Sequence, residues 1–441
     1  MKKKNPIALT VSLSFMGMIV FSTQTACRHD TEDNDTIVTA TLSNVTAVGY
    51  TYHQNGGNRY VLGKGNLDTL TPINIQLDSE IKWVAAAASD GQHSFWVAVL
   101  ADGNVHSYRV DDEGFKEKSI LPSTLNYPIP PTLVVEQHTE LKLGNLLDSA
   151  SIYTNTVVLN ANGDRAFIAR NGDIILQKAG KISRLEINTL PYSKILVDES
   201  ERLLVLTTPS SEYGHTGVLG YRHAHAKTIS LIETKSEFSV LKTITLPDED
   251  VVEGNALIWT DVDGDGTREI ISTLSRNIES ARLVVLNEDG TVKSESPPIN
   301  IADRWRHQIA IAPFVDNDQM NLLSVHIPHL NPEIESFRID DGSMMEHRYF
   351  SSYSSHFTGG LNLDMAMSGD FDGDDKIELL LIERGNLDEI AAFEFRDGEI
   401  QQDWTFNLSN SMTSNAAAVT LPNNQIAYGV GQGDVLSIWH P

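Results

Sequence analysis

Short apolar runs alternate with polar turns along most of the chain. The runs at 96–101, 283–286 and 393–395 are each followed within a few residues by Asp-Gly. Asp-Gly between alternating segments is typical of tight hairpin turns. Runs of this length match strands better than helices, which need about ten residues or more. The pattern therefore predicts an all-β chain built from consecutive hairpins.

Two acidic loops interrupt this pattern with the same spacing of carboxylates. The acidic positions are Asp261, Asp263, Asp265 and Glu269 in the first copy and Asp370, Asp372, Asp374 and Glu378 in the second. Carboxylates this close together repel one another unless a cation lies among them. Oxygen ligands at such offsets, with a backbone carbonyl between them, surround calcium. We predict one calcium ion per loop, with the carbonyls of Thr267 and Lys376 as further ligands.

The EF-hand is excluded as the source of these loops. That motif needs a bidentate Glu at position 12 and a helix on each side. Position 12 is Ser272 in the first copy and Leu381 in the second. Short apolar runs flank both loops, at 256–259 and 270–274 in the first copy. Each copy is therefore predicted to be a strand–calcium loop–strand unit.

These units resemble the FG-GAP or VCBS repeats of integrin-like β-propellers. The match rests on the four acidic positions of each copy, and Asp375 in the second copy stands where the repeat usually has Gly. In that family the loop joins the first two strands of a blade and the acids hold calcium at the blade edge. The resemblance implies a β-propeller and calcium as its cofactor. The family includes adhesins and non-catalytic domains of enzymes.

The spacing of the apolar runs agrees with a repeat of about 50 residues. First strands of successive units are expected near residues 83, 157, 195, 257, 309, 365 and 415. A further unit is expected within 37–80, which gives seven or eight four-stranded blades. The C-terminal unit is one strand short, and residues 37–42 are predicted to supply it. The segment 132–153 fits no blade and is interpreted as an insertion.

The N-terminus has the pattern of an export signal. Three lysines precede a broken apolar run at 7–21, which predicts a signal peptide over 1–26. Cys27, the only cysteine, follows the run and resembles the lipidated cysteine of bacterial lipoproteins. We predict lipidation of Cys27, a flexible tether over 27–36 and a single propeller domain over 37–441. An ordinary cleaved signal is the alternative.

The charge and the N-terminal residues limit which partners the protein is expected to bind and where in the cell it is expected to lie. The formal net charge of −26 disfavours binding to nucleic acid, because phosphate backbones are repelled. The lipid anchor predicts contact with a membrane. Arg28, rather than Asp, follows the predicted lipidated residue, which favours the outer membrane of the cell envelope. Without lipidation the protein would be secreted or soluble in the periplasm.

Other chemistry is sparse along the chain. His223 and His225 lie on one face of an expected strand and could bind zinc or copper, but exposed polar positions of an outer strand are the favoured interpretation. His326 and His329 are similarly ambiguous. The six tryptophans are expected mainly to pack between blades rather than to line a carbohydrate site. No nucleophile elbow and no zinc-protease motif occurs, and no catalytic residue is predicted.

The resulting expectation is a non-catalytic binding or scaffolding lipoprotein. Its carboxylate clusters are assigned to metal loops, and carboxylates fixed by a metal are poor general bases. A protein or glycan ligand is expected on one face of the propeller. The alternatives are a polysaccharide-active lyase or hydrolase on a calcium-binding propeller, and an envelope assembly factor.

Overall fold

The computed structural model describes residues 44–441 except 89–90, 122–127, 138–139, 144–149, 216–224, 248, 277–279, 317–318 and 341. All described residues belong to one compact unit, Thr39–Pro441. The predicted signal peptide, Cys27, the tether and the strand predicted at 37–42 lie outside the described residues. Within the described ranges, no helix has the length and apolar character needed to cross a membrane.

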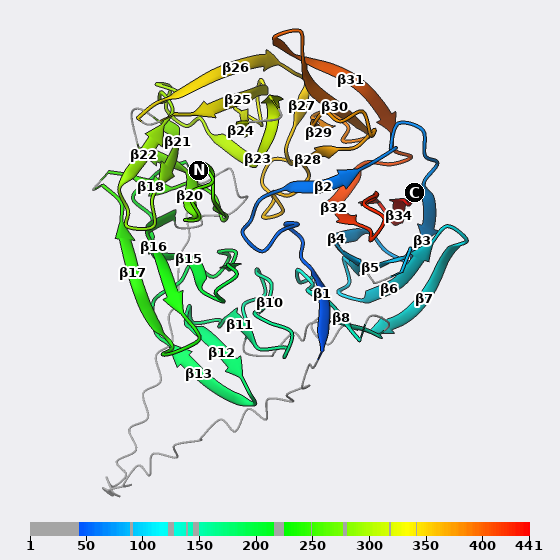
Figure 1. The fold of residues 1–441 in the computed structure, drawn as a ribbon, viewed down its shortest axis with the longest axis horizontal. Coiled ribbons are helices and arrows are strands. Elements are labelled where there is room, and N and C mark those ends of the chain that lie inside the picture. Colours follow the sequence, from blue (N-terminus) through cyan, green and yellow to red (C-terminus); the bar gives the residue numbers. More distant parts are fainter. Residues whose placement is uncertain are drawn as a thin grey trace, which may run out of the picture. The chain divides into compact units, whose positions relative to one another are not determined.

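Every regular element of the described residues is a β-strand, which confirms the all-β prediction. Within the unit the sheets follow one another in chain order around a common centre, as Figure 1 shows. Three of the described sheets are antiparallel and contain four strands that are consecutive in the sequence, and the nine-stranded sheet contains two further such units. This arrangement is a β-propeller.

The sheets in the first part of the ring are listed here with their strands. One sheet contains β4 (Ile81–Ala88), β5 (Ser94–Leu100), β6 (Val105–Asp111) and β7 (Gly114–Leu121). Its neighbour has three strands, β1 (Val45–Gly49), β8 (Leu133–Glu136) and β9 (Glu140–Leu143). The next contains β10 (Val157–Val158), β11 (Arg165–Ile168), β12 (Ile174–Lys178) and β13 (Lys181–Leu185).

A nine-stranded sheet contains two four-stranded units that a short strand joins. The first unit is β14 (Leu196–Val197), β15 (Leu203–Ser210), β16 (His225–Glu233) and β17 (Ser239–Thr245). The second is β19 (Ile258–Thr260), β20 (Glu269–Arg276), β21 (Ser280–Leu286) and β22 (Val292–Glu295). The strand β18 (Val251–Val252) pairs with both β16 and β20.

The remaining sheets complete the ring. One contains β23 (Arg306–Asp316), β24 (Gln319–His326), β25 (Glu333–Ile339) and β26 (Met344–Phe350). The next contains β28 (Met367–Asp370), β29 (Glu378–Glu383), β30 (Glu389–Arg396) and β31 (Glu399–Asn407), with β2 (Tyr60–Lys64) and β27 (Tyr353–Ser354) beside them. The last contains β32 (Met412–Thr420), β33 (Ile426–Gln432), β34 (Val435–Trp439) and β3 (Ile73–Gln76).

The described sheets are consistent with the predicted seven or eight blades, and with eight if the joined units are counted separately. The predicted first strands begin within three residues of the observed β4, β10, β14, β19, β23, β28 and β32. The apolar runs therefore locate these strands well, because each first strand is enclosed by its own sheet and its neighbours.

Two predictions about the early part of the chain are wrong. Residues 37–80 do not form a unit of their own, because β1, β2 and β3 join three different sheets. The segment 132–153 is not an insertion, since β8 and β9 pair with β1 to form a sheet. In both cases the pairing joins strands far apart in the sequence, and hairpin spacing carries no information about such pairs.

The C-terminal sheet closes the ring by taking a strand from the N-terminal region. β3 runs antiparallel to β34, with Ile73 opposite Ile438 and Gln76 opposite Val435. The predicted type of closure is therefore present, with β3 as the described donor strand. Closure of this kind pairs the otherwise free edge of the last sheet.

The core lies between neighbouring sheets. Ile81 and Trp96 from one sheet pack with Val419, Ala427 and Ile438 from the next. All residues of β5 are buried, so this strand reads as a continuous apolar run rather than an alternating one.

Four of the six tryptophans are buried, which confirms that they pack between sheets. Trp96, Trp259, Trp305 and Trp439 are at most 2% exposed. Aromatic side chains of this size bury large apolar areas and fill the space between sheets. Trp83 and Trp404 are only partly buried, and both belong to the sites described below.

The strand directions define two faces. The acidic loops join first and second strands, at the C-terminal ends of β19 and β28. The segments that lead into β4, β23 and β28 lie at the opposite ends, together with the loop between β24 and β25. We call these the acidic-loop face and the entry face.

Candidate metal-binding loops and ligand pockets

The first acidic loop is ordered by hydrogen bonds to its own carboxylates. The amides of Gly264 and Gly266 donate to Oδ1 and Oδ2 of Asp261 at 2.7 and 2.9 Å. The amide of Val262 donates to Oε2 of Glu269 at 3.0 Å. Both glycines have positive φ, at 77° and 87°, a region that glycine enters without strain.

The second loop follows the same backbone course. The amides of Gly373 and Asp375 donate to Oδ1 and Oδ2 of Asp370 at 2.7 and 3.2 Å. The amide of Phe371 donates to Oε2 of Glu378 at 2.5 Å. Asp375 has a φ of 73° where the first copy has glycine. The two sequence copies therefore form equivalent structures, flanked by strands as predicted.

The structure groups the predicted ligands differently in the two loops. In the first loop, ligand oxygens of Asp261, Asp263 and Asp265 lie within 4.8 Å of one another. Glu269 is not part of this group. Its Oε1 lies 3.3 Å from Nζ of Lys293 on β22, which also contacts Oδ2 of Asp263. Hydrogen bonding to this lysine lowers the pKa of Asp263 below its ordinary value.

In the second loop all the predicted carboxylates converge. Oxygens of Asp370, Asp372, Asp374 and Glu378 lie within 4.8 Å of one another. Glu378 is fully buried, and its Oε1 has no hydrogen-bond partner. Burial raises the pKa of Glu378 to about 9, and the three aspartates add to the shift. On β31, Trp404 donates from Nε1 to Oδ2 of Asp372 at 3.1 Å.

The second loop fits calcium by the chemistry of its donors. A buried carboxylate oxygen without a partner costs about 1–3 kcal/mol, and a cation among these groups would remove that cost. The site offers only oxygen ligands, which suit calcium better than zinc or copper. Lys376 lies at the exposed edge, where Nζ is 3.3 Å from Asp374 and 3.1 Å from Glu394. The carbonyl ligands predicted at Thr267 and Lys376 stay predictions.

A third group of possible ligands already contains its own cations. Oxygens of Glu333 and Glu335 lie close to the ring of His326. Arg306 binds Glu335 through Nε at 3.0 Å, and Arg348 lies 3.2 Å from the same carboxylate. The arginines neutralise this carboxylate, so the group is a buried ion network and not a vacant metal site. His326 is buried, and so is His225 on β16, which corrects the expectation of an exposed position for His225.

The entry face contains an aromatic cavity of about 480 Å³, which we call the axial pocket. Trp83 comes from β4, Tyr153 precedes β10, and Phe357 lies in the segment before β28. Its remaining lining residues are Lys82, Pro128, Ile152, Gly359, Gly360, Leu361, Asn362 and Thr413. The pocket therefore exists only after several sheets have assembled.

A second cavity on the entry face, of about 320 Å³, is the histidine pocket. Its lining residues are His215, Asp303, Arg304, Trp305, Ile327, Pro328, His329, Leu330 and Thr358. Behind it, Nε2 of His356 lies 2.8 Å from Nε2 of His329. Burial lowers the pKa of His329 to about 4 and that of His356 well below its ordinary value.

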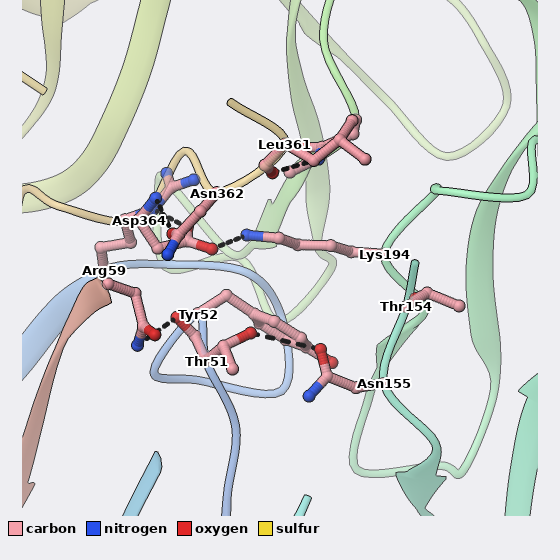
Figure 2. A network of polar contacts seen from close by, with 12 residues as sticks. Thr51, Tyr52, Arg59, Thr154, Asn155, Lys194, Leu361, Asn362 and Asp364 are labelled. Carbon is pink, nitrogen blue, oxygen red and sulfur yellow. Dashed lines mark hydrogen bonds and ion pairs between the residues drawn. The ribbon is translucent and has the colours of Figure 1, made fainter. Parts of the chain in front are cut away.

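A buried ion cluster connects segments from several sheets (Figure 2). Arg59 donates from Nε to Oδ1 of Asp364 at 2.6 Å, and Lys194 binds Oδ2 of the same carboxylate. Burial lowers the pKa of Lys194 to about 8. Its Nζ lies 4.9 Å from the ring centroid of Tyr52. Because these residues precede β2, β14 and β28, the cluster fixes the entry segments of these strands.

The pockets and the ion cluster were not found by sequence reasoning. Arg59, Lys194 and Asp364 each stand alone in the sequence, with no motif around them. Of the histidine pocket, only His329 and Trp305 were considered beforehand, and Trp305 was expected to pack between blades. Contacts between separate sheets leave no local signal, and a set of covarying positions would be needed to find them.

No family model and no curated protein sequence matches the chain. Solved structures match it as folds. Virginiamycin B lyase from Staphylococcus aureus, solved with quinupristin, has a TM-score of 0.46 and 11% identity over 84% of this chain and 98% of its own. The C-terminal WD40 domain of Sif2 has a TM-score of 0.49 and 9% identity, covering 86% and 100%. BamB from Moraxella catarrhalis has a TM-score of 0.41 and 10% identity, covering 85% and 98%. At such low identity the likeness concerns the fold alone.

Proposed function

We propose that this chain is a non-catalytic binding or scaffolding lipoprotein of the bacterial cell envelope. Its propeller is stabilised by calcium, and its entry face holds a protein or glycan ligand. The observation that carries the binding role is the axial pocket, where Trp83, Tyr153 and Phe357 meet from separate sheets. Aromatic side chains bind sugar rings or apolar side chains with little loss of conformational entropy.

Calcium has a structural part in this proposal. The ligands in the second loop would be the four grouped carboxylates and the carbonyl of Lys376. The unpartnered Oε1 of Glu378 supports this assignment. The acidic-loop face lies at the far end of β28 from the axial pocket, so calcium would stiffen the sheet without entering the pocket. An affinity of about 10⁻⁴ to 10⁻³ M is typical of extracellular calcium modules.

The polysaccharide lyase or hydrolase alternative has one observation in its favour. Such an enzyme needs acids and bases gathered on one face. His215, Asp303, Arg304 and His329 line one pocket on the entry face. The binding experiment is therefore designed to detect turnover as well as binding.

The ligand is tested with the full mature chain in the presence of calcium. A glycan array and immobilised envelope proteins report binding, and a panel of polysaccharides reports cleavage. We expect saturable binding without turnover, lost in Trp83→Ala. The matched control is Phe350→Ala, which removes an aromatic side chain that is 76% exposed on β26. Turnover that disappears in His329→Ala would overturn the non-catalytic proposal. Equal binding by Trp83→Ala and Phe350→Ala would show that the ligand does not bind in the axial pocket.

The anchor is tested separately at Cys27. Mass spectrometry of the native N-terminus should find a lipidated Cys27, and the protein should partition with membranes. Two or more acyl chains anchor a protein stably, whereas one is marginal. Unchanged membrane partitioning of Cys27→Ser would contradict the lipoprotein assignment.

A further inference from the structure

The histidine pocket brings together imidazoles from separate segments. His329 lies in the loop between β24 and β25, and His356 follows β27. Their Nε2 atoms are 2.8 Å apart, and the rings are inclined at 80°. Two neutral imidazoles in this contact share a single proton, because one nitrogen donates and the other accepts. A metal ion that replaces this proton must lie to one side of the line between the two nitrogens, with both lone pairs turned towards it.

The ring of His356 is held from its other side. Its Nδ1 lies 3.0 Å from Oγ of Ser355, and that oxygen lies 2.7 Å from Nδ1 of His307. Metal-binding histidines commonly engage their second ring nitrogen in such a hydrogen bond, which fixes the tautomer and the ring orientation. With Nδ1 engaged, Nε2 of His356 is directed at His329.

A third imidazole in the same pocket has a carboxylate behind it. Nδ1 of His215 lies 2.6 Å from Oε1 of Glu253. Glu253 is 1% exposed, and its other oxygen accepts from Ser275. A buried carboxylate that orients an imidazole is a common arrangement around metal sites. Nε2 of His215 is thereby left for the pocket.

Aromatic packing alone does not account for this arrangement. Trp305 stacks on His307 with ring centroids 4.9 Å apart, and its edge contact with His356 is at 5.3 Å. These contacts explain why the rings are buried together. They do not require two ring nitrogens to face each other, nor a buried carboxylate behind a third imidazole.

We propose that the histidine pocket binds a first-row transition-metal ion of the zinc or copper class through His329 and His356. Metal–nitrogen bonds of about 2.0–2.1 Å at a tetrahedral angle place two neighbouring ligand nitrogens about 3.3 Å apart, so the two imidazoles must separate by about 0.5 Å from the observed 2.8 Å. His215 is outside common ligand distance of the pair in the described residues. It binds a water or an incoming ligand at one of the metal's open positions. This site is distinct in place and chemistry from the acidic loops.

Zinc is the probe for the first experiment. Isothermal titration of the full mature chain is carried out with calcium in saturating excess, so that the acidic loops do not compete for zinc. We expect one zinc ion per chain, with binding lost in His329→Ala and His356→Ala. Cobalt(II) in place of zinc should give visible absorption bands that report nitrogen ligands. His347→Ala on β26, where the residue is exposed, is the matched control and should bind zinc normally.

A second set of variants tests the residues behind the ligands. Ser355→Ala should weaken zinc binding about 10- to 100-fold, as loss of the orienting partner of a ligand does. Glu253→Gln should weaken it less, because His215 does not bind the metal directly. Calorimetric melting of each zinc-free variant verifies that it folds, and the partly exposed His329 in a loop is the substitution least able to prevent folding. Absence of zinc uptake by the wild-type protein, or full uptake by folded His329→Ala, would overturn the proposal.

Discussion

In the sheet β19–β22 a lysine on the fourth strand contacts the acidic loop, whereas in the sheet β28–β31 that contact comes from a tryptophan. Nζ of Lys293 binds Asp263 and Glu269. Nε1 of Trp404 donates to Asp372. On the side of the fourth strand the first loop therefore contacts a full positive charge, whereas the second loop receives a neutral donor there and has Lys376 only at its exposed edge.

The difference shows that a motif can fix the backbone without fixing the electrostatics. Both loops make the same amide-to-carboxylate hydrogen bonds, and their sequences share the four acidic positions and one glycine. Their demand for a cation is set by a residue on the fourth strand. We therefore expect calcium to bind the second loop more tightly. In the first loop the ion must either displace Lys293 or bind beside its positive charge.

The largest expected effect follows from replacing one glutamate in each loop. Calcium at about 100 times its dissociation constant should stabilise the wild-type fold by about 2.7 kcal/mol. Glu378→Gln should lose most of this gain, and Glu269→Gln should keep most of it. In EDTA, Glu378→Gln should be the more stable protein by about 1 kcal/mol, because glutamine is buried as a neutral side chain without taking up the proton that Glu378 must bind on folding.

Calorimetric melting with and without calcium measures both effects. Asp261→Asn and Asp370→Asn each remove another grouped carboxylate and should lower the calcium response of their own loop. An equal calcium response of Glu378→Gln and Glu269→Gln would remove the distinction between the loops.

The second effect is a pH dependence in calcium-free protein. The pKa of Glu378 is raised from 4.5 in the unfolded chain to about 9 in the fold. The folded state therefore holds a proton that the unfolded state has lost, and stability falls as pH rises between these values. Calcium takes the place of that proton, so its stabilising effect should grow with pH. Urea unfolding at pH values from 5 to 9 measures the free energy of unfolding at each pH. This free energy should change less with pH in Glu378→Gln than in Glu269→Gln.

Replacing Lys293 should make the calcium affinities of the two loops more similar. A unit charge at about 4 Å in water is worth about 1 kcal/mol, so Lys293→Gln should tighten calcium at the first loop about fivefold. Lys242→Gln removes the same charge from an exposed position on β17 and should leave calcium binding unchanged. Equal effects of both variants would point to net charge rather than to the contact with Asp263.

The smallest effect concerns Trp404. Trp404→Phe keeps most of the apolar contact but deletes the hydrogen bond to Asp372. One hydrogen bond contributes about 0.7 kcal/mol, so calcium at the second loop should weaken about threefold. Calcium titration followed by calorimetry measures the change, and Trp439→Phe is a control in a neighbouring sheet. A change of tenfold or more would mean that Trp404 positions the whole loop.

Local features of the fold and of the loops could be predicted from the sequence. Strand starts follow from apolar runs, and the two metal loops follow from residues that are close together in the chain. The pairing of β1, β2 and β3 could not be predicted, because each joins strands that are remote in sequence. The same holds for Lys293, which meets Asp263 only because the hairpins of one sheet fold back on each other.

The site on the entry face was hidden for a related reason. His329 and His356 come from different loops, and neither has a sequence context that distinguishes it from a surface histidine. Their contact depends on two neighbouring sheets being packed side by side. Only three-dimensional structure brings such residues together.

The pairing of β3 with β34 has a consequence for the synthesis of the protein. Ile73–Gln76 leaves the ribosome early, but its partner strand ends two residues before the last residue of the chain. At about 5–20 residues per second, the early strand waits on the order of half a minute before its partner exists. The ring cannot close until β34 has been synthesised, and a chain truncated before β34 would leave β3 without its partner strand.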